Sequence, residues 1–207
     1  MTKSFQFLFD FGGPNSYLAH KMLPDICART GAEAVYIPIS LGGLFKLTNN
    51  QAPFMRYAET PAKRNYEMLE FDRFVKAHAL PFKMNPRFPI NSLQLMRGAV
   101  AAQHLGCFAP YVDAVMAAMW EDGADMSDAQ IIASVLDAAG IDSAALLAKA
   151  EDPAVKAELI ANTEDASKRG ALWATRYIGG KNGLVSLRLR SQCRDFQFLS
   201  CAAIDSR

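Results

Sequence analysis

The chain has 207 residues and a formal net charge of +1 at pH 7, and 51% of its residues are hydrophobic. The near balance of 22 basic and 21 acidic side chains argues against nucleic acid and against an acidic membrane surface as partners. No apolar run approaches the ~18 residues that span a bilayer, and residues 1–4 lead into a predicted strand without a secretory signal. We therefore expect a globular protein of the cytoplasm that does not bind membranes.

The first predicted element is a strand, because phenylalanine alternates with other residues at four positions: Phe5, Phe7, Phe9 and Phe11. A Gly-Gly-Pro turn follows at 12–14, and a helix opens there with Asn15 or Ser16 as its N-cap. A strand that ends in a tight turn before a helix N-terminus presents backbone N–H groups to an anion or a thiolate. This turn is therefore the first candidate for a functional site.

A second strand is predicted over 34–39, and Gly31 ends the helix before it. Pro38 cannot donate a backbone hydrogen bond, so it places this strand at a sheet edge or at a bulge. Strand, helix and strand in this order predict a βαβ unit with a parallel pair and a right-handed crossover.

From about Pro61 to Gly170 nearly every segment has a helical pattern, with helix starts predicted at Thr60, Asn91 and Ser127. Apolar side chains recur at helical spacing, which indicates faces that pack in the core. The chain is thus predicted to have an α/β fold with a large all-helical insertion. It should then return to the sheet with at least two more strands and a terminal helix.

The four cysteines form neither a C-x-x-C pair nor a zinc spacing, and we expect Cys27 and Cys107 to be buried as small hydrophobic residues. Three histidines lie on predicted helices without metal-ligand spacing and are expected to be structural: His20, His78 and His104. No metal site is predicted. Trp120 either lines a cleft or packs in the core, and core packing is favoured.

Five ordered motifs carry a family resemblance: DFGGPNSYLA (10–19), LGGLFK (41–46), NNQAP (49–53), PAKRNY (61–66) and NPRFPINSLQLMRGA (85–99). Together they resemble the 2-hydroxychromene-2-carboxylate isomerases and the kappa-class glutathione transferases over about residues 4–170. The resemblance implies a thioredoxin-like domain with a helical insertion domain. Residues 1–48 would form the first half of the thioredoxin-like domain. Residues 49–165 would form the helical insertion domain, and with 166–207 the chain would return to the thioredoxin-like domain.

The resemblance also implies glutathione as cofactor and a homodimer. The expected reaction is a cis/trans isomerisation of an aromatic-degradation intermediate, a small aromatic carboxylate. Addition of the glutathione thiolate to a conjugated form of the substrate turns a double bond into a single one. Rotation follows, and elimination regenerates the thiol. This chemistry needs a thiol held as thiolate near neutral pH, whereas a free thiol has a pKa of about 8.5.

At the turn, the active-site serine of these families falls at Gly13, which has no side-chain donor. Asn15 and Ser16 are therefore candidates for the catalytic donor beside Gly13, although both also suit a plain capping role. Pro14, in the same turn, is assigned to glutathione binding rather than to catalysis. Aligned with the C-P-x-C motif of thiol oxidoreductases, positions 13–16 lack both cysteines, which excludes dithiol exchange at this site.

Asn50 and Lys63 match positions that hold glutathione in kappa-like proteins. An amide and an ammonium suit the peptide groups and carboxylates of glutathione. Alternatively, Asn50 is a turn residue and Lys63 is a solvated helix lysine.

Asn85, Asn91 and Arg97 lie in a proline-bounded segment that is expected to face a cleft and bind the substrate. Arg97 would hold the substrate carboxylate through two parallel hydrogen bonds. The alternatives are a helix cap for Asn91 and a surface salt bridge for Arg97.

The tail, residues 171–207, departs from the resemblance. The families continue with a strand, a cis-proline loop that pairs with glutathione, another strand and a closing helix, but no proline follows Pro153 here. The tail is rich in arginine, and only 183–189 has a strand-like pattern. We hypothesise that the tail is translated in a reading frame shifted from that of the related families. If the tail is genuine, the first two strands are expected to lack partners.

Two other functions remain open from the sequence. A glutathione transferase of the kappa type would consume glutathione, whereas an isomerase returns it. A non-catalytic family member would keep the fold and bind a small molecule, and the glycine at position 13 favours this alternative. A disulfide oxidoreductase is the weakest candidate, because no C-x-x-C pair is present.

Overall fold

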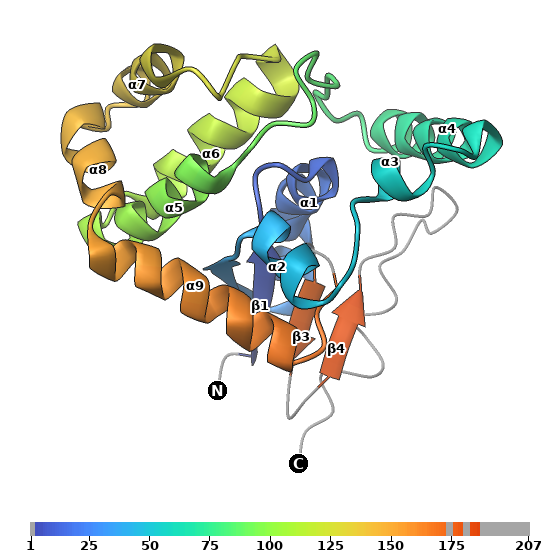
Figure 1. The fold of residues 1–207 in the computed structure, drawn as a ribbon, viewed down its shortest axis with the longest axis horizontal. Helices are drawn as coiled ribbons and strands as arrows, with labels where there is room; N and C mark the ends of the chain where they lie inside the picture. The colour runs from blue at the N-terminus through green and yellow to red at the C-terminus, as the bar shows by residue number, and fades with distance from the viewer. Residues whose placement is uncertain (1–2, 173–175, 180–182, 187–207) are drawn as a thin grey trace.

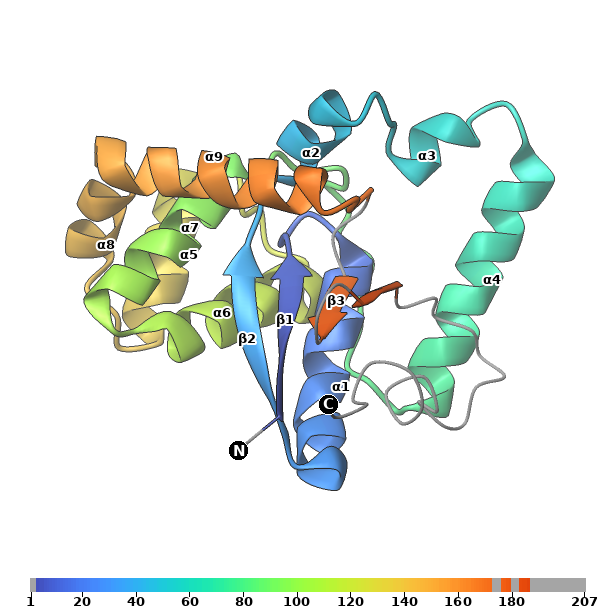
Figure 2. The same ribbon diagram turned by 90° about the horizontal axis from the view of Figure 1, so that it is seen from below.

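The computed structural model describes residues 3–172, 176–179 and 183–186 (Figure 1). A four-stranded sheet has the order β2-β1-β3-β4. In Figure 2, helices α5–α8 lie at one side of the sheet, and the short α3 and the long α4 stand at the other. The predicted α/β fold with many helices between the second and third strands is thus confirmed.

The N-terminal βαβ unit forms as the sequence predicted. Strand β1 (Lys3–Phe9) pairs in parallel with β2 (Ala32–Pro38), and α1 (Pro14–Thr30) connects them. Gly31 ends α1 in the left-handed conformation, with φ of 65°. Because β2 is an outer strand, Pro38 at its end is tolerated.

The chain returns to the sheet with two short strands after the helices. Strand β3 (Arg176–Gly179) runs antiparallel to β1, and β4 (Gly183–Ser186) runs antiparallel to β3. The expectation that the first strands would lack partners is therefore wrong for β1, which is paired on both sides. Of the predicted strand over 183–189, residues 183–186 form β4, and 187–189 lie outside the described residues. The predicted terminal helix falls outside the described residues, and the frame hypothesis stays a prediction.

Helices fill the chain between β2 and β3. Their bounds are α2 (Leu41–Leu47), α3 (Pro53–Arg56), α4 (Pro61–Ala77), α5 (Leu93–Leu105), α6 (Phe108–Ala117), a π-helical turn (Ala118–Asp122), α7 (Ala129–Ala138), α8 (Ser143–Ala150) and α9 (Pro153–Lys168). Thr60 precedes α4 with Pro61 as its first residue, as predicted.

Three predicted N-caps are wrong by one to three positions. Helix α1 begins at Pro14 with Gly13 as N-cap, because proline already has a helical φ and no N–H to satisfy. Helix α5 has Ser92 rather than Asn91 as N-cap. Helix α7 has Asp128 rather than Ser127, since the Asp128 carboxylate accepts the N–H groups of the first turn.

The sheet is covered on both faces. The alternating phenylalanines of β1 pack with α1, α5 and α6 in one large core. On the other face Leu8 packs with Ile39, with Leu44 of α2 and with Ala166 of α9. Burial on both faces gives β1 little freedom to shift its register.

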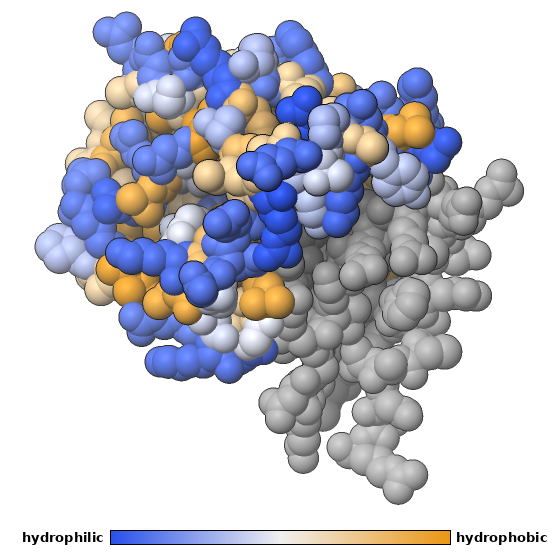
Figure 3. Space-filling model, turned by 45° about the vertical axis from the view of Figure 1, so that its right-hand side comes forward, coloured by the Kyte–Doolittle hydropathy of each residue, from blue (hydrophilic) through white to orange (hydrophobic). Residues whose placement is uncertain are grey.

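Helix α4 is the least buried of the long helices in the described part of the chain. Only Phe74 is buried along it, whereas Tyr66 and Leu69 are 58% and 45% exposed. Figure 3 shows apolar side chains interspersed with hydrophilic ones over one face of the molecule. Among the described residues, no helix has the length and apolar composition needed to cross a bilayer.

Candidate functional site

The turn between β1 and α1 is tightly hydrogen-bonded. The Gly13 N–H donates to the Asp10 carbonyl at 3.2 Å, and the Ser16 N–H donates to the Gly13 carbonyl at 2.8 Å. Because Pro14 has no N–H, Asn15 supplies the remaining backbone donor of the first three helical positions. The positive end of the α1 dipole lies at this same point.

Asp10 is a buried carboxylate directly beneath the turn, and its role was missed in the sequence. Only 1% of the residue is exposed. One carboxylate oxygen accepts the Gly12 N–H at 2.7 Å and the Ser92 hydroxyl at 2.5 Å, and the other accepts the Leu41 N–H at 2.6 Å. Burial raises the pKa of Asp10, and these three donors oppose that rise. An acidic residue directly after an apolar strand was the available signal.

Phe11, the next residue, is held through its backbone by the helical layer. Its N–H donates to the Met96 sulfur at 3.4 Å, and its carbonyl accepts the Trp120 indole N–H at 3.0 Å. Trp120 has no exposed surface, which confirms the predicted core packing. The turn is thus fixed from α5 and from the π-helical turn as well as from Asp10.

The residues predicted to act at the turn differ in accessibility. Asn15 is exposed, whereas Ser16 is fully buried, and its hydroxyl accepts the Asp10 N–H at 3.5 Å. Gly13 has a φ of −102°, which any residue adopts. A Cβ on Gly13 would lie 3.4 Å from the Ser16 hydroxyl and 3.9 Å from Leu41 Cδ2, which is ordinary contact. The backbone therefore has room for the serine that the resemblance places here.

The two predicted glutathione-binding side chains, Asn50 and Lys63, have contacts other than with the residues that hold the turn. The Asn50 amide donates to the Leu172 carbonyl at 2.9 Å and accepts from the Arg56 guanidinium at 2.8 Å. Lys63 is exposed on α4, with its ammonium 4.0 Å from the centroid of the Tyr57 ring. Asn50 thus lies beside the chain's return to the sheet, and Lys63 lies on the outer helix.

Asn85 is buried and fixes the irregular segment before α5. Its amide nitrogen donates to the carbonyls of Met119 and Ala124, both at 2.9 Å, and its oxygen accepts the Arg87 N–H at 2.9 Å. All these partners are backbone groups of the protein, so the contacts seen for Asn85 are structural.

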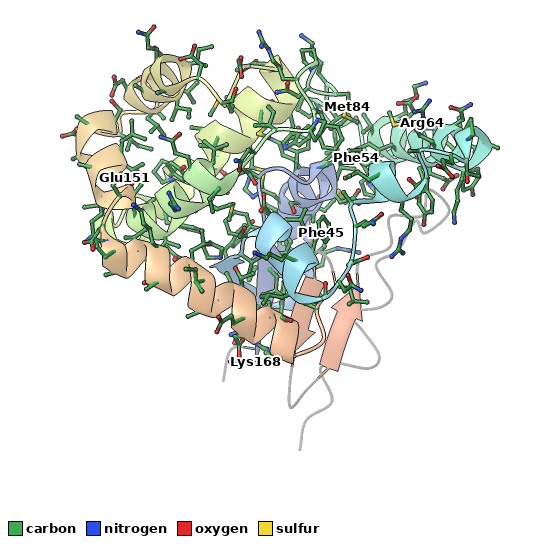
Figure 4. The ribbon with its side chains drawn as sticks, in the orientation of Figure 1. Phe45, Phe54, Arg64, Met84, Glu151 and Lys168 are labelled. Atoms are coloured by element: carbon green, nitrogen blue, oxygen red, sulfur yellow. The ribbon has the colours of Figure 1, made fainter. Side chains whose placement is uncertain are left out.

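Arg97 pairs with Glu151 at 3.9 Å, which agrees with the surface salt bridge left open in the sequence. Figure 4 shows Glu151 at the corner between α8 and α9, on the opposite side of the molecule from Arg64 on α4. Asn91 is exposed, and its side chain accepts the Leu93 N–H at 3.1 Å in a cap-like contact. Asn85, Asn91 and Arg97 therefore each contact a different part of the protein, and their role in substrate binding stays a prediction.

Comparison with known proteins identifies the family. The model of the DSBA-like thioredoxin domain matches residues 5–172. The chain belongs to this family. It is 28% identical over 174 residues to a 2-hydroxychromene-2-carboxylate isomerase of Sphingobium xenophagum, covering 84% of this chain and 87% of that protein.

Solved structures share the fold of this DsbA-like chain. A structure of SeMet 2-hydroxychromene-2-carboxylate isomerase has a TM-score of 0.79 at 22% identity, covering 95% of this chain and 93% of that one. The cytosolic disulfide reductase DsbM from Pseudomonas aeruginosa, with GSH, has a TM-score of 0.56 at 16% identity, covering 95% and 97%. These likenesses confirm the predicted thioredoxin-like fold, and the resemblance to the isomerases is confirmed with it. The family match ends at residue 172, close to residue 170, where the resemblance described from the sequence ends.

The histidines of this DsbA-like chain have structural contacts. His20 lies between the Tyr36 hydroxyl at 2.8 Å and the Asp113 carboxylate at 3.1 Å. His104 pairs with Glu158 at 2.7 Å, and His78 packs on the Phe74 ring. Among the residues that the structure describes, no group of three metal-ligating side chains is close enough to hold a metal ion.

Cys27 and Cys107 are only partly buried, so the prediction that they are buried is wrong. Both pack at the edge of the large core rather than within it. Burial raises the pKa of the Cys27 thiol, which keeps it in the unreactive thiol form. Cys193 and Cys201 lie outside the described residues.

We predict that Asp10→Asn destabilises the protein by about 1–3 kcal/mol. The amide offers one acceptor oxygen where the carboxylate has two, so the N–H of either Gly12 or Leu41 loses its partner. Urea unfolding of this variant, of wild type and of Asp25→Asn measures the effect. Asp25 is exposed on α1, so Asp25→Asn removes the same negative charge without a buried partner and serves as the control. Equal unfolding free energies for the two variants would contradict the role given to Asp10.

We also predict that His20 lowers the unfolding free energy of the protein at pH values below 6.5. Burial lowers the pKa of His20 below the ordinary value of 6.5, although Asp113 opposes the shift. The unfolded chain therefore takes up the proton at higher pH than the folded one. Stability due to His20 is complete above pH 6.5 and is lost as the pH falls through the folded pKa.

The measurement is the unfolding free energy at a series of pH values from 7.5 to 5. Wild type should lose stability faster than His20→Gln over this range, by at most about 1.4 kcal/mol per pH unit. The groups facing His20 are Asp113, Tyr36, Lys21 and Glu121, and all are kept in the variant. Parallel curves for the two proteins would exclude His20 as the source.

Proposed function

We propose that the protein is a glutathione-dependent cis/trans isomerase of the 2-hydroxychromene-2-carboxylate isomerase type. Its substrate in this proposal is an aromatic carboxylate from the breakdown of aromatic compounds, and it works as a cytoplasmic homodimer. The observation that carries the proposal is the 28% identity to an isomerase of that name over 84% of the chain. An alignment of this extent takes in far more than one motif.

The turn before α1 suits a bound thiolate. The helix dipole and the Asn15 N–H favour negative charge there, and a Cβ at Gly13 would make only ordinary contacts with Ser16, Asp10 and Leu41. Glutathione, when bound, supplies a thiolate that adds to a conjugated double bond and leaves again after rotation. The chain's task is to hold that sulfur ionised and to orient the substrate beside it. At the level of the fold alone, the DsbM structure with GSH is a precedent.

Of the side chains predicted to hold ligands, Lys63 remains the strongest candidate for a glutathione carboxylate. Its ammonium is exposed, and its contact with the Tyr57 ring is one that a carboxylate can join. Asn85 and Arg97 are already engaged with protein groups. Binding of the substrate carboxylate by Arg97 would require its pair with Glu151 to open.

Gly13 also favours a second candidate function, a family member that binds a small molecule without catalysis. Removing one donor to an anion in a preorganised site lowers turnover by about 10²–10³-fold. Tight glutathione binding without turnover on any aromatic carboxylate would favour this alternative. A kappa-like transferase would differ from both, because free thiol would disappear during the reaction.

The first test is a calorimetric titration of the full chain with reduced glutathione. We expect micromolar to low-millimolar binding, weakened by Lys63→Ala because one cation is lost from the ligand's carboxylate. Lys76→Ala, at the exposed C-terminal end of the same helix, is the control for a change of charge on α4. A folded wild type that binds no glutathione would overturn the glutathione mechanism.

A second test restores the serine. We predict that Gly13→Ser folds normally, because its Cβ meets only ordinary contacts, and that it turns over substrate about 10–100-fold faster by adding a donor to the thiolate. Gly12→Ser is the matched control. A Cβ there lies 3.1 Å from the Ser92 hydroxyl and 3.2 Å from the Asp10 carboxylate, so crowding should lower its stability. Thermal unfolding and an isomerisation assay on both variants decide the matter. An unchanged rate in a folded Gly13→Ser protein would count against a thiolate at this position.

A further inference from the structure

Ser92 occupies the N-cap position of α5, but its hydroxyl does not cap the helix. The side chain makes no hydrogen bond to the first turn of α5. It donates instead to the Asp10 carboxylate, 2.5 Å away and 82 residues earlier in the chain. The neighbouring Asn91 side chain accepts a first-turn N–H, that of Leu93. The hydroxyl of Ser92 is therefore available for a task other than holding its own helix.

The Asp10–Ser92 pair lies against the turn, directly before Gly13. A Cβ built on Gly12 would be 3.1 Å from the Ser92 hydroxyl and 3.2 Å from the Asp10 carboxylate. Ser92 is partly exposed, whereas Ser16, the other serine near the turn, is fully buried. Of these two serines, only Ser92 has exposed surface at which a ligand can approach.

We propose that Ser92 provides the side-chain hydroxyl contact to a thiol at this turn that residue 13 lacks, with Asp10 as the positioning residue behind it. This inference rests on the proposed function, because it requires a thiol ligand beside the N-terminus of α1. It assigns the ligand contact to a residue at the start of α5 rather than to one in the turn.

The pair can also take up the proton of the thiol. The Ser92 hydroxyl proton passes to the Asp10 carboxylate while the Ser92 oxygen accepts the proton of the S–H bond. One S–H bond breaks, one O–H bond forms on Asp10, and the sulfur keeps the electron pair. Ser92 then donates its new O–H to the thiolate. Burial raises the pKa of Asp10, which makes it a better proton acceptor than an exposed aspartate.

The test measures the ionisation of bound glutathione in four proteins: wild type, Ser92→Ala, Ser92→Thr and Asn91→Ala. The readout is the ultraviolet absorbance of the thiolate as a function of pH, together with the dissociation constant from calorimetry. In Ser92→Ala the pKa of the bound thiol should rise by about one unit, and the affinity for the thiolate form should fall about tenfold. Ser92→Thr keeps the hydroxyl and should resemble wild type. Asn91→Ala changes the neighbouring cap and should leave the thiol pKa unchanged.

The outcomes separate the inference from the function on which it rests. A wild type that binds no glutathione overturns both. A wild type that binds glutathione, with an unchanged thiol pKa in Ser92→Ala, overturns the role of Ser92 and leaves the proposed function in place. An equal shift in Asn91→Ala would mean that the start of α5 acts structurally, and it too overturns the inference. If Ser92→Ala does not fold, Ser92→Gly replaces it, since glycine also lacks the hydroxyl and is well tolerated at an N-cap position.

Discussion

The carboxylate of Asp10 is the interaction on which the rest of the candidate site depends. Its two oxygens receive donors from three parts of the chain: the turn at Gly12, the start of α2 at Leu41 and the start of α5 at Ser92. Each of these segments ends or begins an element, where backbone groups would otherwise need water. A buried charge is costly unless such donors surround it, so Asp10 and the three segments hold one another in place.

The helical layer contributes to the site by holding the backbone of the turn. Met96 and Trp120 bind the two backbone groups of Phe11, and Asn85 fixes the segment that precedes α5. The helices between β2 and β3 therefore do more than cover the sheet. They fix the position of the short loop at which we propose that a thiolate binds.

The elements that were predicted correctly from the sequence are those determined by residues close together in the chain. The alternating phenylalanines, Gly31 and Pro38 each act through neighbouring residues, and all were interpreted correctly. The N-cap of α1 was misplaced because the fixed φ of Pro14 outweighed the capping preference of Asn15 and Ser16. The role of Asp10 and the partner of Arg97 were out of reach, because Ser92 and Glu151 are distant in sequence from the residues they contact. The return of the chain to the sheet was predicted, but β3 was not recognised, because residues 176–179 lack the alternating pattern that marked the first strand.

The weak packing of helix α4 determines which part of the molecule opens most easily. With one buried side chain along 17 residues, it gains little free energy from packing, and isolated helices of this length are marginally stable in water. Its local opening therefore requires far less free energy than unfolding of the sheet, whose central strand is covered on both faces. The helix that carries Lys63 can unwind or swing while the turn at Asp10 stays fixed. The two regions that carry predicted ligand-binding residues thus differ in local stability, and α4 opens before the turn that carries Asp10 does.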